Sequence, residues 1–161
     1  MSWFKDWFDS EYYHILYKNR DKKEAQFFID NIVDKLQIKP ESKIIDIACG
    51  NGRHATYLNS LGFNVVGIDL AKNSILDAKI NESRKLQFRV HDMRETYSDN
   101  YFDVVMNLFT SFGYFSDKND NQRSIKAMAN NLKKGGCLII DFMNVKKVIA
   151  NLVKSEQKTI D

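Results

Sequence analysis

The stretch IIDIACGNGRH, which runs from Ile44 to His54, decides the fold. Its first four residues read as a short buried strand, in which apolar side chains surround the carboxylate of Asp46. Gly50 and Gly52 lack a Cβ atom, so the backbone can turn sharply there and approach a ligand closely. A helix expected over residues 53–61 would begin with free N–H groups beside this turn. The stretch therefore predicts a strand, a glycine-rich turn and a helix around a ligand site.

A second apolar run follows the expected helix and ends in another acid. This run is NVVGIDL, residues 64–70, whose β-branched side chains lead to Asp69. Gly62 fits the end of the intervening helix, because helices commonly stop at a glycine. A Gly-x-Gly turn after one strand, with an acid at the end of the next, is typical of nucleoside-binding βαβ units.

The rest of the chain continues to alternate strands with helices. Apolar residues recur at helical spacing up to Ile38, and Pro40 ends that helix. Gly135 and Gly136 are expected to end a later helix. Further strands are expected over residues 86–90, 101–109 and 137–142, and a last helix over residues 145–153. This alternation predicts an α/β fold with a parallel sheet and helices on both faces, whose strand ends meet at one ligand-binding edge.

Length and composition indicate one ordinary globular domain. The chain has 161 residues, of which 43% are hydrophobic and 28% charged, and its net charge of +3 is too small to indicate a nucleic-acid partner. Cys49 and Cys137 lie far apart in apolar contexts, so we expect two buried thiols, not a disulfide or a metal site. Residues 1–10 carry acids and tryptophans where a signal peptide needs an apolar core. We therefore expect a cytoplasmic protein without a membrane partner.

Three acids distinguish between the two cofactor classes that use such a glycine turn. A dinucleotide places its pyrophosphate on the turn, which favours a turn without negative charge. S-Adenosylmethionine carries a cationic sulfonium and an ammonium instead, and acidic groups suit those charges. Asp46, Asp69 and Asp92 lie at or near the ends of three successive strands, where Asp69 would bind the ribose hydroxyls and Asp92 the adenine amine. S-Adenosylmethionine is therefore the favoured cofactor.

Five segments resemble the class I S-adenosylmethionine-dependent methyltransferases, in the order that the family has them. They are IIDIACGNGRH, VVGIDL, VHDM, FDVVMNLFTSFGYF and LKKGGCLIIDF, which cover most of residues 42–142. The opening WFDSEYYHILYKNRD is similar to the start of a bacterial small-molecule branch of that family. The resemblance implies a three-layer α/β sandwich with a mostly parallel Rossmann-like sheet of about five strands in the order 3-2-1-4-5.

The resemblance also implies which residues bind the cofactor and the methyl acceptor. The cofactor residues would be Asp46, Ala48, Gly50, Asn51, Gly52, Asp69, Leu70, Asp92, Met93, Asn107 and Leu108. The residues near the acceptor would be Tyr13, Tyr17, Phe112 and Tyr114.

The end of the chain departs from the family pattern. The family's sheet has seven strands, the last two forming an antiparallel hairpin, whereas the residues after Phe142 read as a helix and a polar tail. We therefore expect the hairpin to be missing and the chain to be truncated or shortened. The expected segments are an N-terminal aromatic lid and helical segment (1–40), a cofactor-binding core (41–144), and a C-terminal helix and tail (145–161). An uncovered fifth strand is an exposed edge, which predicts self-association or aggregation.

Methyl transfer is an in-line displacement, so the protein mainly has to align the acceptor, the methyl group and the sulfur in a dry pocket. A hydroxyl acceptor would benefit from a general base. The candidates for such a base are Tyr13, His14 and Tyr17. His54 and His91 are expected to be structural. Polar residues that could suggest a metal are Asn107, Asp141 and Asn144, but polar strand ends are common, so no metal is expected.

The acceptor class follows from motifs that are missing. Methyltransferases of exocyclic base amines resemble one another in an Asn/Asp-Pro-Pro-aromatic turn, where this chain has Asn107-Leu108-Phe109-Thr110. The Pro-Cys nucleophile of cytosine-carbon enzymes is also absent, and no basic stripe with stacking aromatics stands out. A small-molecule nitrogen or oxygen acceptor is therefore favoured over nucleic acid. The alternatives are a non-catalytic nucleoside- or partner-binding domain and, more distantly, an NAD-dependent oxidoreductase.

Overall fold

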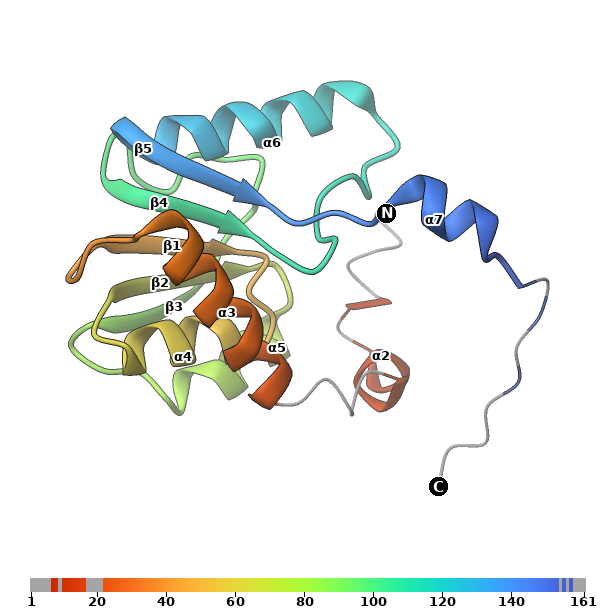
Figure 1. The fold of residues 1–161 in the computed structure, drawn as a ribbon, viewed down its shortest axis with the longest axis horizontal. Helices are drawn as coiled ribbons and strands as arrows, with labels where there is room; N and C mark the ends of the chain where they lie inside the picture. The colour runs from red at the N-terminus through yellow and green to blue at the C-terminus, as the bar shows by residue number, and fades with distance from the viewer. Residues whose placement is uncertain (1–6, 9, 17–21, 154, 156, 158–161) are drawn as a thin grey trace.

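The computed structural model describes residues 7–8, 10–16, 22–153, 155 and 157. Its centre is a parallel sheet of five strands in the order β3-β2-β1-β4-β5 (Figure 1). The strands are β1 (Lys43–Ile47), β2 (Asn64–Asp69), β3 (Leu86–Val90), β4 (Phe102–Asn107) and β5 (Leu132–Ile140). The helices are α2 (Glu11–Leu16), α3 (Lys22–Leu36), α4 (Arg53–Ser60), α5 (Lys72–Lys79), α6 (Lys118–Asn131) and α7 (Val145–Ala150). The predicted strand order is confirmed.

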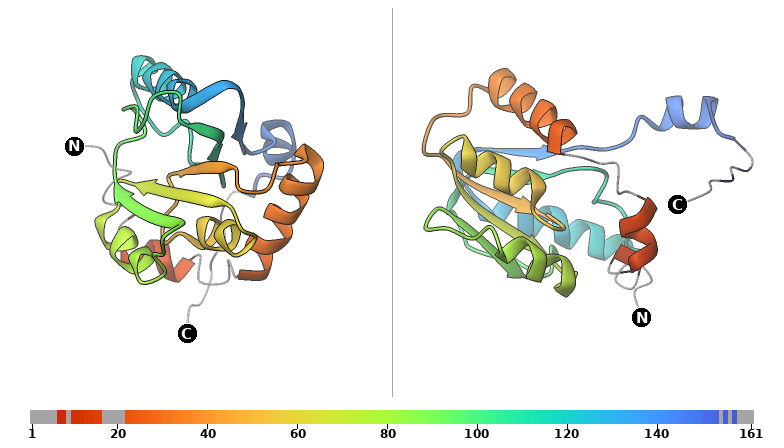
Figure 2. Two further views of the ribbon diagram at one scale, coloured as in Figure 1. Left: turned by 90° about the vertical axis from the view of Figure 1, so that its left-hand side faces the viewer. Right: turned by 90° about the horizontal axis from the view of Figure 1, so that it is seen from below.

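Two apolar clusters fill the space on the two faces of the sheet. Ile44 of β1 belongs to the cluster that also holds buried side chains of α3, α4 and α5. The next residue, Ile45, belongs to the opposite cluster, which includes Met128 of α6. Successive side chains of a strand point to opposite faces, so a central parallel strand needs apolar residues at both positions. The result is the expected three-layer sandwich, with α3 and α4 on one side of the sheet and α6 on the other (Figure 2).

All five strands run in the same direction, so their carboxyl ends form one edge of the molecule (Figure 1). The glycine turn follows β1 at this edge, and Asp69 is the last residue of β2. Helix α2 lies beyond the same edge. The ring of Phe8, just before α2, lies 5.2 Å from that of Tyr114 in an edge-to-face contact. The N-terminal segment thus contacts the loop that follows β4.

Strand β5 differs from the sequence expectation in two ways. Helix α6 ends at Asn131, and Gly135 and Gly136 lie inside β5 instead of ending a helix. A Cβ atom on Gly136 would lie only 3.0 Å from the carbonyl oxygen of Asp103, so this glycine permits close approach to β4. Cys137 is exposed, not buried as expected, whereas Cys49 is buried.

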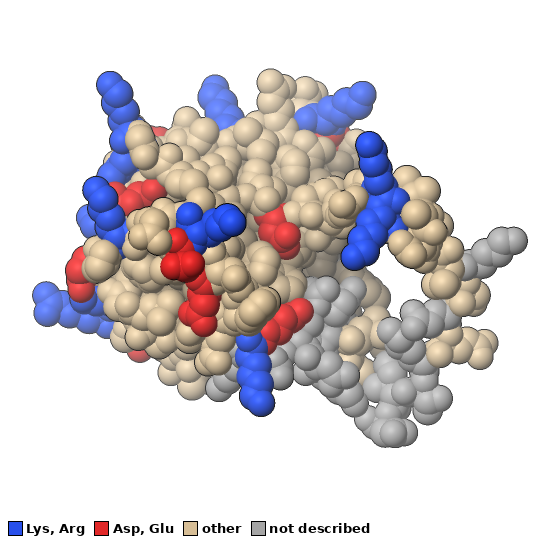
Figure 3. Space-filling model, viewed as in Figure 1, with Lys and Arg blue, Asp and Glu red and all other residues tan. Residues whose placement is uncertain are grey.

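The surface carries charges of both signs. On the face shown in Figure 3, lysine and arginine side chains are spread among aspartate and glutamate side chains and do not gather in one stripe. Within the described residues, no helix has the length and apolar character that crossing a bilayer requires.

Candidate functional site

The turn after β1 has an unusual backbone. Ala48, Gly50 and Gly52 all adopt positive φ angles, of 61°, 55° and 77°. Such angles cost a non-glycine residue free energy, so contacts with surrounding residues must compensate for the strain at Ala48. The amide of Cys49 donates to the carbonyl of Ile68 in β2, at 3.0 Å, and Gly52 donates back to Cys49. The turn is therefore fixed to the neighbouring strand before α4 begins.

The ring of Phe88 explains two of the glycines near this turn. A Cβ atom on Gly52 would overlap the edge of this fully buried ring, and a Cβ on Gly67 of β2 would lie 2.6 Å from it. A Cβ on Gly50 would have no heavy atom within 4 Å. Gly52 and Gly67 thus serve packing, whereas Gly50 faces open space in which a ligand could lie.

We expect Gly52→Ala to lower the free energy of unfolding by about 2–3 kcal/mol, because it combines a strained φ with a clash against Phe88. Gly50→Ala is the matched control, since it has a similar φ but meets no neighbour. Urea denaturation of both variants measures the difference. Equal losses of stability in the two variants would contradict the packing role of Phe88.

Asp69 connects the glycine turn to the start of α5. Its Oδ2 atom accepts a hydrogen bond from the amide of Gly50, and its Oδ1 atom accepts one from the amide of Ala71, both at 2.8 Å. Each carboxylate oxygen has further lone pairs, so these contacts leave the group able to accept from hydroxyls. The acid predicted at the end of the second strand therefore also shapes the turn.

Asp46 is a buried carboxyl group with an unused oxygen. It is 1% exposed, and its Oδ2 atom has no hydrogen-bond partner among the described residues. Burial, and then the charge of Asp69, raise the pKa of Asp46 to about 7, although the guanidinium of Arg53 opposes this. Burial and the same two acids raise the pKa of Cys49, which makes it a poor nucleophile. A cationic ligand group would relieve the unpaired carboxyl of Asp46.

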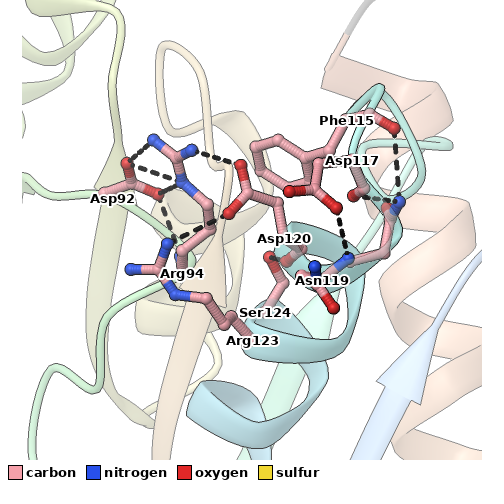
Figure 4. Close-up of polar contacts among 9 residues, drawn as sticks. Asp92, Arg94, Phe115, Asp117, Asn119, Asp120, Arg123 and Ser124 are labelled. Carbon is pink, nitrogen blue, oxygen red and sulfur yellow. Dashed lines mark hydrogen bonds and ion pairs between the residues drawn. The ribbon is translucent and has the colours of Figure 1, made fainter.

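The end of β3 carries a network of ion pairs that joins it to α6 (Figure 4). Arg94 donates from Nε to both carboxylate oxygens of Asp92, at 3.0 and 3.1 Å, and its Nη1 atom lies 2.7 Å from Asp120. Asp120 also pairs with Arg123 at 3.0 Å. Burial alone would raise the pKa of Asp92, but hydrogen bonds and charge from Arg94 outweigh burial and lower it. The predicted adenine acceptor is thus a fixed, ionised carboxylate.

The loop after β4 has a strained backbone, and residues of other elements hold it in place. Phe109 and Thr110 adopt φ angles of 56° and 59°, which are costly for non-glycine residues. Asp141, just after β5, accepts from the Phe109 amide through Oδ2 at 2.9 Å and from the Thr110 amide through its carbonyl at 3.2 Å. The Phe109 ring stacks on His54, with ring centres 4.8 Å apart, and packs against Phe28.

Two histidines that were expected to be structural, and one asparagine considered as a metal ligand, make structural contacts. His54 is buried in the aromatic stack with Phe109. The Nε2 atom of His91 lies 3.0 Å from the carbonyl of Glu95. Asn144 caps α7 by accepting from Lys147 at 3.1 Å. Among the described residues, no three His, Cys, Asp or Glu side chains are grouped to hold a metal ion.

The structure brings the eleven predicted cofactor residues to one edge of the sheet. These residues lie at or just after the ends of β1, β2, β3 and β4, and they are Asp46, Ala48, Gly50, Asn51, Gly52, Asp69, Leu70, Asp92, Met93, Asn107 and Leu108. Asn107 is fully buried and donates to the carbonyl of Ile47 at 2.9 Å. Phe112 and Tyr114 lie in the loop after β4. Tyr17 and the side chains of Tyr13 and His14 lie outside what the structure describes.

Sequence reasoning missed the roles of four residues that shape this edge: Gly67, Phe88, Arg94 and Asp141, the last of which was considered only as a metal ligand. A signal existed for Gly67, because an isolated glycine inside a strand indicates close approach of another group. The contacts of Arg94 and Asp141 had no local signal, because their partners include residues far away in the sequence.

Comparison with known proteins places this geometry in a family. A family model described as a methyltransferase domain matches residues 38–160. The methyltransferase-like protein YqeM of Bacillus subtilis is 35% identical over 111 residues, which cover 67% of this chain and 45% of YqeM. The chain thus spans about half the length of that relative.

Two solved structures have the same fold. The sugar N-methyltransferase KedS8 from Streptoalloteichus matches with a TM-score of 0.67 and 27% identity, covering 81% of this chain and 53% of KedS8. An S-adenosylmethionine-dependent methyltransferase from Clostridium acetobutylicum matches with a TM-score of 0.73 and 23% identity, covering 93% of this chain and 62% of the other. The sheet order and the glycine turn are consistent with the family match, and the chain belongs to the methyltransferase domain family.

Proposed function

We propose that this chain binds S-adenosylmethionine and transfers its methyl group, by in-line displacement, to a nitrogen or oxygen atom of a small molecule. The observation that carries the proposal is the unpaired, buried carboxyl oxygen of Asp46 beside the open turn at Gly50. A cationic cofactor would favour the ionised form of Asp46 and fits this pair, whereas the pyrophosphate of a dinucleotide would meet the negative charge of Asp69. Family membership supports the same reaction class.

The proposed cofactor site assigns a role to each strand end. The turn at Gly50 and Gly52, with Asp46, would hold the methionine portion, and Asp69 with Leu70 would hold the ribose. The adenine would lie between Asp92 and Met93. Asn107 and Leu108 would line the side of the sulfonium. The bound sulfonium activates the methyl group, so the protein contributes alignment and exclusion of water.

The proposed acceptor pocket lies between the loop after β4 and the N-terminal segment. Phe112 and Tyr114 would line it, and the contact of Phe8 with Tyr114 supports an aromatic lid in the first part of the N-terminal lid and helical segment (1–40). Tyr13, His14 and Tyr17 remain the candidates for positioning the acceptor or accepting its proton. A small-molecule acceptor is supported by the likeness to a sugar N-methyltransferase. We place the reaction in the cytoplasm, without a nucleic-acid or membrane partner.

The outer edge of β5 supports a proposal of self-association. Among the described strands, β5 pairs only with β4, so its other edge offers unpaired backbone groups. We expect a second copy to pair with this edge, and we expect Cys137→Lys to weaken the association by placing a charge there. Sedimentation at several protein concentrations, with a reductant to exclude disulfides, measures both. A monodisperse monomer at high concentration would contradict the proposal.

Calorimetric titration with S-adenosylhomocysteine tests the cofactor assignment, with NADH as the control ligand. Saturable binding of the first and none of the second supports the proposal. Incubation with radiolabelled S-adenosylmethionine and pooled small metabolites then tests methyl transfer, since a binding domain without activity would bind the cofactor but label nothing. A folded sample that does not bind S-adenosylhomocysteine would refute the proposed function.

A further inference from the structure

Arg94 occupies a position that the proposed methyl transfer does not itself require. It lies two residues after Asp92, and its guanidinium reaches from the end of β3 to the first turn of α6 (Figure 4). The side chains of Arg94, Asp92 and Asp120 are 28%, 18% and 22% exposed. Isolated surface ion pairs contribute little to stability, but this one is partly buried and has several hydrogen bonds.

The geometry leaves Asp92 a single orientation. The backbone amide of Arg94 donates to Oδ1 at 2.9 Å, while its Nε atom bonds both carboxylate oxygens. A carboxylate that is held in this way presents its remaining lone pairs in fixed directions. Such a group can distinguish an amine, which donates a hydrogen bond, from a carbonyl, which would repel it.

The opposite side of Arg94 is fixed as well. Asp120 accepts from Nη1 of Arg94 and from Arg123, so its position is set within α6. The Arg94 guanidinium carbon also lies 5.0 Å from the ring centre of Phe115, in the loop between β4 and α6. Arg94 therefore braces the end of β3 against both α6 and this loop.

We propose that Arg94 is a positioning residue for base recognition: through its contacts with Asp92 and Asp120, it aims the Asp92 carboxylate at the 6-amino group of adenine. The inference rests on the proposed function, since it takes Asp92 as the adenine acceptor. It goes further by assigning the preference for an amino group over a carbonyl to a residue that does not touch the base.

The test is a comparison of two ligands by calorimetry. They are S-adenosylhomocysteine and its deaminated analogue, S-inosylhomocysteine, in which a carbonyl replaces the 6-amino group. We expect the wild type to prefer the amine by about 10- to 100-fold, and Arg94→Gln to remove most of that preference by weakening only the binding of the amine. Arg94→Lys should restore part of it. Asp120→Asn, which leaves the contacts between Arg94 and Asp92 in place, should give an intermediate ratio.

Arg89→Gln is the matched control. Arg89 is also an ion-paired arginine of this region, lies on β3 and bonds Glu82 at 2.7 Å, outside the network of Arg94. Its loss should leave the ligand ratio unchanged. Thermal denaturation shows whether each variant is folded. If Arg94→Gln does not fold, the ratio of the two ligand affinities in Asp120→Asn tests the proposal instead.

The outcomes separate the two proposals. If the wild type binds S-adenosylhomocysteine but folded Arg94→Gln keeps the full preference for the amine, the role of Arg94 is refuted and the cofactor assignment stands. A wild type that binds both ligands equally also refutes the role of Arg94. A wild type that binds neither refutes the proposed function, and this inference with it.

Discussion

Replacing Asp69 by alanine is expected to weaken the binding of S-adenosylhomocysteine by about 100-fold or more. The substitution removes the proposed acceptor for two ribose hydroxyls. It also removes the partner of the Gly50 and Ala71 amides, each bonded at 2.8 Å, so the turn loses its fixed shape. Calorimetric titration measures the loss directly.

Two further variants identify the cause of that loss. Asp69→Asn keeps one acceptor oxygen without the charge, so its affinity should lie between those of the wild type and the alanine variant. Asp77→Ala removes an exposed acid from the neighbouring helix α5 and should bind normally. If Asp69→Ala bound as tightly as the wild type while remaining folded, the ribose would have to lie elsewhere.

Replacing Asp46 by asparagine is expected to separate stability from binding. In the ligand-free protein, the carboxyl of Asp46 has a pKa of about 7, above its usual value of 3.8, first because it is buried and then because Asp69 is near. The neutral form is therefore the one that the fold favours. This contribution to stability is fully present below about pH 4 and is lost as the pH rises through 7, a change of about 4 kcal/mol.

Asparagine has no charged form, so Asp46→Asn should not lose stability over this range. Its amide must be accommodated without a partner, which costs about 1–3 kcal/mol at every pH. We therefore expect the variant to be less stable than the wild type at pH 4, where the wild type keeps most of this contribution, and more stable at pH 8, where the wild type has lost it. Its affinity for S-adenosylhomocysteine at pH 8 should fall by about 10-fold or more, because the ligand's ammonium loses a carboxylate. Urea denaturation measures the free energies of unfolding at both pH values, and calorimetry measures the affinity for S-adenosylhomocysteine.

Asp103→Asn is the control with the opposite sign. Burial alone would raise the pKa of Asp103, but Lys133 and the backbone amide of Lys43 outweigh it and lower the pKa. Asp103 therefore contributes stability above its unfolded pKa that is lost as the pH falls, and the contribution is small because the ion pair is partly exposed. If the stability of Asp46→Asn followed the same pH profile as the wild type, Asp46 would not be the group responsible.

The sequence was sufficient to locate most of the strands because each carried its own signal, whereas their order in the sheet came from the resemblance to the methyltransferase family. The buried run around Asp46 and the acid at Asp69 could be recognised from adjacent residues alone. The first part of β5 could not, because Gly135 and Gly136 resemble a helix end, whereas they lie in a strand that approaches β4 closely. Local patterns do not record which distant backbone a glycine must approach.

For the candidate site, the sequence likewise predicts the positions of the residues but not their contacts. The positions of the acids follow from strand ends, so they could be placed at one edge without a structure. What each acid contacts could not be foreseen, since Asp92 depends on Arg94 and, through it, on Asp120, which follows only after β4. Similarly, the backbone of Phe109 depends on Asp141, which lies 32 residues later.

The dependence of Phe109 and Thr110 on Asp141 sets an order in which the site can form as the chain folds. The contacts of Asp69 with the glycine turn need only the residues up to Ala71, whereas the strained pair needs Asp141, just after β5, which is the last of the described strands along the chain. Contacts between distant residues form slowly, because a long loop must close first. During synthesis, a nascent chain can therefore form the glycine turn and its contacts with Asp69 before the loop after β4, which would border the acceptor, takes its strained conformation.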